Sequence, residues 1–215
     1  LPFTGFFIYK ILNKIHLSPF YHKCTIFLSA YISINLAAFF TALELGIQPL
    51  LFVDNLAQPL YCPYPLWISI PAMALSHLTI AGIAEGLFTL SLYLFILKTS
   101  PNIIYDSQQI KLNSLFSLLA FLIIISPLGL IAEGTAWGEW APEEILNDTS
   151  SGVSLGFIPE KLLNGFNYEA FFPDYTMSGT TDILAYIASA IIGVALLIII
   201  FKILGSIIYA KKQSL

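Results

Sequence analysis

The sequence has no arginine, only two cysteines and few charged residues. Charged residues make up 10% of its 215 residues, and hydrophobic residues make up 57% with a mean hydropathy of +0.82. A soluble globular domain carries about 25% charged residues, so this composition indicates an integral membrane protein. The net charge of −4 and the lack of a basic cluster exclude a nucleic-acid-binding surface. No nucleic acid is therefore expected among its partners.

Several motifs that carry chemistry are also missing. Cys24 and Cys62 lie at opposite ends of one predicted span, so they are expected to face opposite sides of the membrane and not to pair. No CxxC motif, HExxH motif or Walker A motif occurs, and no catalytic triad can be assembled from the sequence. We therefore expect no cofactor and no enzymatic activity.

Four long apolar stretches predict transmembrane helices over about residues 24–46, 66–97, 112–131 and 182–203. The second of these is too long for one crossing, and Pro71 is expected to mark the start of its regular helix. Residues 1–9 are apolar but too few to cross a bilayer, and we interpret them as a span cut in half. The chain is then expected to be the C-terminal part of a longer protein.

The predicted fold is an all-α integral membrane protein with about four full transmembrane helices plus a truncated first span. An extracytoplasmic loop domain, residues 132–181, is expected between the last two helices. This orientation follows from the lysines, because eight of the nine fall on one side of the predicted membrane, and positive residues favour the cytoplasm. We therefore predict a multi-pass protein of the inner (cytoplasmic) membrane with a cytoplasmic C-terminus.

The loop over residues 132–181 is rich in aromatic and acidic residues. Aromatic side chains gather at membrane–water interfaces, so one interpretation is a small cap that lies on the membrane surface. The other interpretation is that the carboxylates attract cations. The sequence alone leaves both open.

Two ionisable residues, His77 and Glu85, lie in the middle of an apolar span. A charge at the centre of a span costs about 2.5–3.5 kcal/mol on insertion scales, so such residues usually face a bundle interior or a polar pathway. In a regular helix they would lie roughly 80° apart around the axis and about 12 Å apart along it, too far to bind one ion together. Gly82 and Gly86 form a small-residue pair that permits close helix packing. The pair could hold helices together through hydrogen bonds, or it could support a substrate pathway.

The preceding span, residues 24–46, contains two further polar candidates. Asn35 lies near mid-membrane and is expected to hydrogen-bond across helices. Glu44 lies near the outer end, where a solvated position is the expectation.

The residues resemble a known family in two blocks. The first block resembles the CbiM/NikM family, and the runs that carry the likeness are residues 33–38, 41–49, 63–66 and 77–89. The second block resembles the CbiN/NikN-type PDGLE domain, and its runs are residues 126–130, 134–140, 156–159 and 173–175. The literal PDGLE motif is replaced here by Pro173-Asp174-Tyr175. The resemblance implies a CbiM/NikM-like part over residues 1–108 and a PDGLE domain over residues 109–215.

The resemblance implies the membrane subunit of an energy-coupling-factor importer that captures Ni²⁺ or Co²⁺ from outside. Its partners would be a transmembrane coupling (T) subunit and cytoplasmic ATPase subunits, which hydrolyse the ATP. The family binds its ion with the terminal amine and histidines of the N-terminal half, so the direct ligands are expected upstream of residue 1. No metal ligand is assigned in this chain, because His16 and His22 fall in the predicted cytoplasmic connector. His77, Glu85, Asn35 and Glu44 remain candidates to support the ion site or to line its pathway.

A second class of function stays open. The chain could be a non-transporting membrane scaffold that assembles or stabilises a metal-transport partner. A Met-His start in the parent sequence, with a further histidine in its first half, would favour transport. A membrane enzyme would need a cluster of titratable groups, and the sequence offers only the pair His77 and Glu85.

Overall fold

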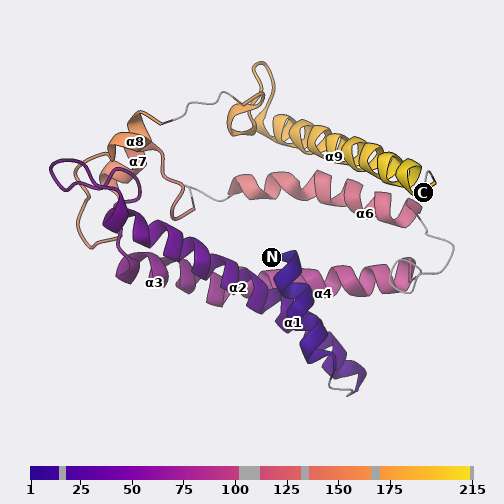
Figure 1. Ribbon diagram of the computed structural model, residues 1–215. Coiled ribbons are helices and arrows are strands. Elements are labelled where there is room, and N and C mark those ends of the chain that lie inside the picture. The colour runs from indigo at the N-terminus through magenta and orange to yellow at the C-terminus, as the bar shows by residue number, and fades with distance from the viewer. Residues whose placement is uncertain (15–17, 102–111, 132–135, 166–169, 214–215) are drawn as a thin grey trace. The chain divides into compact units, whose positions relative to one another are not determined.

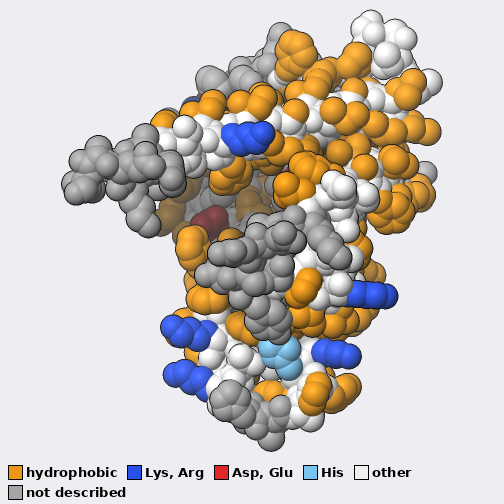
Figure 2. Space-filling view, turned by 90° about the vertical axis from the view of Figure 1, so that its right-hand side faces the viewer, with side chains coloured by type: hydrophobic (Ala, Val, Ile, Leu, Met, Phe, Trp, Pro, Cys, Tyr) orange, Lys and Arg blue, Asp and Glu red, His pale blue; other side chains and the backbone are white. Residues whose placement is uncertain are grey.

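Long apolar helices dominate the computed structural model, which describes residues 1–14, 18–101, 112–131, 136–165 and 170–213. Four of these helices are long and apolar enough to cross a membrane: Pro19–Leu51, Leu66–Thr99, Leu112–Ile131 and Asp182–Ile207. The described residues contain no strand beyond an isolated bridge between Val53 and Pro59. The chain is therefore an all-α multi-pass membrane protein, as predicted. Hydrophobic side chains (orange) cover much of the described surface drawn in Figure 2, and only a few lysines (blue) lie among them.

The chain divides into two compact units. The first comprises residues 1–108 and 135–167, and the second comprises residues 109–134 and 168–215. The predicted loop 132–181 is thus shared between the units, because its described residues 136–165 fold with the N-terminal helices. The boundary predicted at residues 108/109 stays a prediction.

The membrane-spanning helices of the first unit pack around α2 (Pro19–Leu51). Its neighbours are α1 (Pro2–Leu12), α3 (Leu66–Ser76), the π-helical turn η1 (His77–Ala81) and α4 (Gly82–Thr99). Figure 1 shows α3 and α4 following one another along α2, with α1 crossing it. The hydroxyl of Ser33 donates to the backbone carbonyl of Leu1 at 2.7 Å, which ties the start of α1 to α2. Two short helices, α7 (Pro142–Asn147) and α8 (Glu160–Leu163), complete this unit.

Helix bounds differ from the sequence-based expectation at two prolines. The expectation for Pro71 was wrong, because α3 begins at Leu66 and Pro71 lies inside it. The end of α2 is also later than expected, since the helix continues through Pro49 to Leu51. Proline removes one backbone hydrogen bond, but membrane helices tolerate it where neighbouring groups satisfy the freed carbonyl.

The second unit pairs two apolar helices. Helix α6 (Leu112–Ile125) continues into the 3₁₀ segment η2 (Ser126–Ile131), and both pack against α9 (Asp182–Gln213). The segment η3 (Pro173–Tyr175) lies at the start of α9, where the Tyr175 and Tyr186 ring centres are 5.0 Å apart. Most described side chains of α9 are exposed and apolar, as expected of a lipid-facing helix.

Candidate functional site

A row of side chains on α2 packs into a groove on α4. Phe27, Tyr31 and Asn35 recur every four residues, so they lie on one face of α2. A Cβ atom at Gly86 would come within 2.6 Å of the Phe27 ring, and one at Gly82 within 2.7 Å of the Asn35 amide nitrogen. The two glycines therefore allow α2 and α4 to approach at the level of the ionisable residues. This confirms the close packing that their spacing predicted.

The helix departs from regular α geometry between His77 and Ala81. This five-residue segment is a π-helix, and the backbone N–H of Gly82 donates to the carbonyl of His77. A π turn advances by roughly 80° per residue against about 100° in an α-helix, so His77 and Glu85 lie roughly 20° apart around the axis. The interruption thus turns the two ionisable residues toward one face of the helix. No pattern in the sequence indicated it.

Tyr31 contacts the π-helical turn directly. Its hydroxyl donates to the carbonyl oxygen of Leu78 at 2.9 Å, and its ring stacks on Phe27 with a centroid distance of 6.1 Å. The hydrogen bond joins α2 to a carbonyl within the irregular turn. Sequence reasoning did not single out Tyr31, because only its position opposite the turn makes it distinctive.

The imidazole of His77 is oriented by its own helix. Its Nδ1 lies 2.9 Å from the carbonyl oxygen of Met73 and 3.1 Å from Ser76 Oγ. A carbonyl oxygen only accepts hydrogen bonds, so Nδ1 carries the proton. Histidine binds metal ions through an unprotonated ring nitrogen, and with the proton on Nδ1 that nitrogen in the neutral form would be Nε2.

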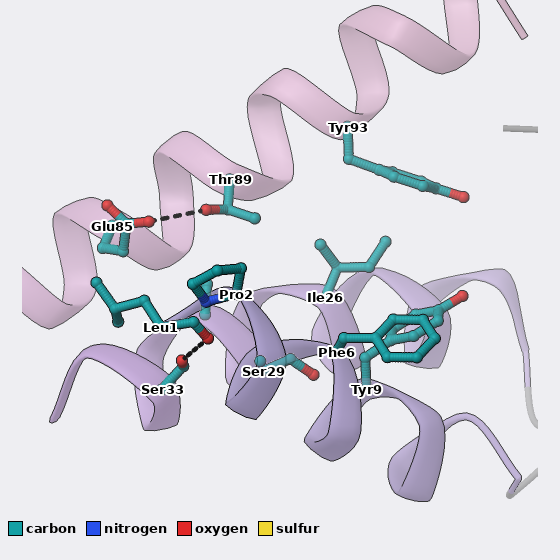
Figure 3. A pocket seen from close by; sticks show the side chains of 12 residues that line it. Leu1, Pro2, Phe6, Tyr9, Ile26, Ser29, Ser33, Glu85, Thr89 and Tyr93 are labelled. Atoms are coloured by element: carbon teal, nitrogen blue, oxygen red, sulfur yellow. Dashed lines mark hydrogen bonds between the residues drawn. The ribbon is translucent and has the colours of Figure 1, made fainter. Parts of the chain in front are cut away.

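Glu85 faces an apolar cavity of about 680 Å³ between α1, α2 and α4. Its Oε1 accepts a hydrogen bond from the Thr89 hydroxyl at 3.2 Å, one helical turn away. Figure 3 shows both side chains across the cavity from Leu1, Pro2 and Ser33. His77 is not among the residues that line this cavity.

The other two candidates on α2 behave differently. The amide of Asn35 donates to Tyr31 O at 2.8 Å, within its own helix. The expected hydrogen bond from Asn35 across helices was therefore wrong for the described residues, although the amide packs against Gly82. Glu44 is exposed, in agreement with a solvated position.

A histidine at the lysine-bearing end links three helical segments. Nδ1 of His22 lies 3.0 Å from the Asn13 side-chain oxygen, and its Nε2 lies 3.1 Å from Tyr93 Oη. The imidazole also packs in T-shaped arrangements against the rings of Tyr9 and Tyr93, with ring-centre distances of 5.9 and 5.7 Å. His22 therefore joins α1, α2 and α4, a role that sequence reasoning missed. His16 lies outside the described residues.

Outside the predicted membrane, an aromatic junction joins residues far apart in the sequence. Tyr64 is 1% exposed, and its ring centre lies 5.9 Å from Trp137 and 5.4 Å from Trp140. The Tyr64 hydroxyl hydrogen-bonds the Asp148 carboxylate, whose other oxygen accepts from Trp140 Nε1 at 3.1 Å. We call this group, with Cys62, the aromatic junction. Residues 136–148 therefore pack against the loop before α3. The prediction of a cap on the membrane surface did not include this contact.

Burial and hydrogen bonding shift the pKa values in the aromatic junction. Burial and the neighbouring Asp148 carboxylate raise the pKa of Tyr64 well above its ordinary value. Burial acts to raise the pKa of Asp148, but hydrogen bonds from Tyr64, Ser150 and Trp140 outweigh it and lower that pKa. Burial also raises the pKa of the Cys62 thiol. The junction therefore holds a neutral tyrosine on a charged carboxylate at neutral pH.

Metal ligands do not cluster in the part of the chain that the structure describes. No three histidine, cysteine, aspartate or glutamate side chains there come close enough to hold an ion. The described acidic residues of 136–165 therefore offer no ready-made cation site, and the Asp148 carboxylate is part of the aromatic junction.

Comparison with known families accounts for nearly the whole chain. Residues 1–103 match the cobalt uptake substrate-specific transmembrane region, CbiM, and residues 112–210 match the PDGLE domain. The chain therefore contains a CbiM region followed by a PDGLE domain. The aromatic junction thus connects Tyr64, from the CbiM match, to tryptophans and an aspartate from the PDGLE match.

Relatives with both parts are named as transport proteins. The chain is 36% identical over 203 residues to a probable fused nickel transport protein, LarMN, of Lactiplantibacillus plantarum, covering 94% of the chain and 61% of the relative. It is 38% identical over 186 residues to the fused nickel transport protein NikMN of Rhodobacter capsulatus, covering 80% and 54%. A crystal structure of a truncated transition metal transporter is 41% identical, with a TM-score of 0.42 over 45% of the chain and 44% of that structure. These names agree with a transporter family rather than an enzyme family. The chain spans somewhat more than half the length of the two fused relatives.

Proposed function

We propose that this chain is part of the membrane subunit of an ATP-driven energy-coupling-factor importer that captures Ni²⁺ or Co²⁺ from outside. The observation that carries the proposal is the match to fused nickel transport proteins over 94% and 80% of the chain. The four apolar helices agree with a protein that moves its substrate through a membrane. The ion is the substrate, and imidazole nitrogen suits both metals.

The orientation and partners are part of the same proposal. Lys10, Lys14, Lys23 and Lys98 belong to the connectors that the positive-inside rule assigns to the cytoplasm of the inner membrane. The aromatic junction would then lie on the extracytoplasmic side, and the C-terminus in the cytoplasm. A transmembrane coupling subunit and cytoplasmic ATPases would supply the energy.

Within the subunit, His77 and Glu85 would support the ion site or the path by which the ion leaves it. The close α2–α4 packing, the π-helical turn and the contact of His77 Nδ1 with the Met73 carbonyl, which leaves Nε2 for another partner, support this role. Asn35 would act through packing against the turn. Glu44, exposed near the outer end of α2, would lie at the entrance.

The test is uptake of radioactive nickel by cells that produce the intact protein with its partner subunits. Uptake that depends on the protein and on ATPase activity is expected, and competition with cobalt would identify the preferred ion. The alternative is a scaffold that stabilises a metal-transport partner. The scaffold is favoured if a partner alone transports nickel at the same rate once its membrane level is matched.

A further inference from the structure

A π-helical turn inside a membrane span needs stabilising contacts from other residues, because an α-helix pairs the same backbone groups with better hydrogen-bond geometry. Such turns occur often at functional sites. Here the turn begins at His77, and α2 contacts Leu78 within it and Gly82 directly after it. The Tyr31 hydroxyl donates to the carbonyl oxygen of Leu78, and the Asn35 amide packs against Gly82.

We propose that Tyr31 is a positioning residue for transport, which holds the π-helical turn so that Nε2 of His77 points where the passing ion needs it. This inference rests on the proposed function. Tyr31 does not touch the ion in this account. It acts through Leu78, the residue next to His77.

The contacts around Tyr31 agree with a fixed support. Its ring is stacked on Phe27, and Phe27 in turn packs against Gly86. This stacking therefore fixes the position of the Tyr31 hydroxyl opposite the π-helical turn. His77 is held from the other side, because its Nδ1 donates to Met73 O one turn earlier. Loss of the Tyr31 hydroxyl frees the Leu78 carbonyl while it leaves the apolar packing in place.

The lipid-facing side of the turn supports the same conclusion. Ile80 is 79% exposed, so nothing in the described residues presses the turn into its π geometry from that side. The extra residue of a π turn rotates the preceding helix relative to the following one. Without it, His77 and Glu85 would move apart around the axis, toward the roughly 80° of a regular helix.

The test is a double-mutant cycle in the intact protein with its partner subunits, read as nickel uptake per folded molecule. We expect Tyr31→Phe to lower uptake about threefold to tenfold, the size of one lost hydrogen bond. In a His77→Ala background the same change should have no further effect, because Tyr31 acts through His77. The matched control is Tyr21→Phe, also on α2, whose hydroxyl donates to the Leu12 carbonyl at 3.5 Å, and it should leave uptake unchanged.

Equal losses from Tyr31→Phe in both backgrounds would overturn the inference, since they would indicate a general structural role. So would unchanged uptake in Tyr31→Phe. If Tyr31→Phe fails to fold, a variant that lacks Ile80 is tested in its place. This deletion removes the extra residue of the π-helical turn, while both flanking helices keep their contacts. Uptake at the wild-type rate after that deletion would equally overturn the inference. A wild-type protein that imports neither nickel nor cobalt contradicts the proposed function itself, and this inference with it.

Discussion

The first unit contains two polar regions that are built in opposite ways. The aromatic junction is a dense network in which the Asp148 carboxylate accepts hydrogen bonds from Trp140 and from Tyr64, which lies 84 positions away in the sequence. The region around the π-helical turn has few such bonds. Among the described residues, most of its hydrogen bonds lie within one helical turn. There, close packing at Gly82 and Gly86 joins α2 to α4, and the hydrogen bond from Tyr31 joins α2 to the π-helical turn.

The difference follows from the surroundings of each region. Outside the membrane, burial of aromatic surface drives association, and the buried polar atoms are then paired. Inside the membrane, lipid is as apolar as the side chains, so helices associate through close packing of small residues. We infer that the aromatic junction fixes the PDGLE segment on the CbiM segment, whereas the intramembrane region keeps polar groups available for an ion.

The largest effect is expected at Gly82, where close packing holds α2 against the helix that follows the π-helical turn. A Cβ there would clash with the His77 carbonyl oxygen, which can move away only if the backbone shifts, and would also meet the Asn35 amide. Gly82→Ala should destabilise the protein by about 3 kcal/mol or more, which reflects overpacking. Thermal unfolding in detergent measures it. Gly193→Ala is the control, because a Cβ there meets no other atom within 4 Å, and an unchanged melting temperature in both variants would contradict the packing account.

A smaller loss is expected when the aromatic junction loses its acceptor. Asp148→Ala removes the carboxylate that accepts from the Tyr64 hydroxyl and the Trp140 N–H, and a buried group that loses its partner costs about 1–3 kcal/mol. We expect the stability of the docked segment to fall by about 2 kcal/mol, read as faster proteolysis within residues 141–157. Glu139→Ala, a change at an exposed carboxylate nearby, should leave the rate unchanged. Equal protection in both variants would show that the network does not hold the segment.

The junction should also respond to pH at both extremes, unlike the packing at Gly82. The pKa of Asp148 is lowered in the folded protein, so its contribution is present above the ordinary value of 3.8 and is lost as pH falls through the folded pKa. The pKa of Tyr64 is raised above 10.0, so its contribution is complete below pH 10 and is lost as pH rises further. Tryptophan fluorescence against pH measures both limbs. In Asp148→Asn the acid limb should disappear, and its persistence would assign it to another group.

The smallest effect concerns the reactivity of Cys62. Its thiol is 7% exposed and its pKa is raised by burial, so little reactive thiolate is present at neutral pH. In a Cys24→Ser background, maleimide labelling should be slow and should quicken about tenfold when Asp148→Ala loosens the junction. If Asp148→Ala leaves the labelling rate unchanged, Cys62 is shielded from maleimide independently of the PDGLE segment.

The sequence predicted the helices well and the irregular features poorly. Hydropathy located all four spans to within a few residues at most ends, because a bilayer imposes about 20 apolar residues on each. It could not indicate the π-helical turn, since one additional residue leaves no periodic signal. The Tyr64–Asp148 contact was equally hidden, because it joins residues 84 positions apart. His77, Glu85 and the glycine pair were singled out correctly as unusual, but their geometry depended on the turn.

The most direct test of the account is nickel uptake by His77→Ala and Glu85→Ala forms of the intact protein with its partner subunits. The melting temperature of each purified variant is measured alongside uptake. We predict that uptake per folded molecule falls in at least one variant, while both melting temperatures stay near the wild-type value. Uptake at the wild-type rate in both variants would contradict a transport role for the intramembrane pair and would leave it as packing alone.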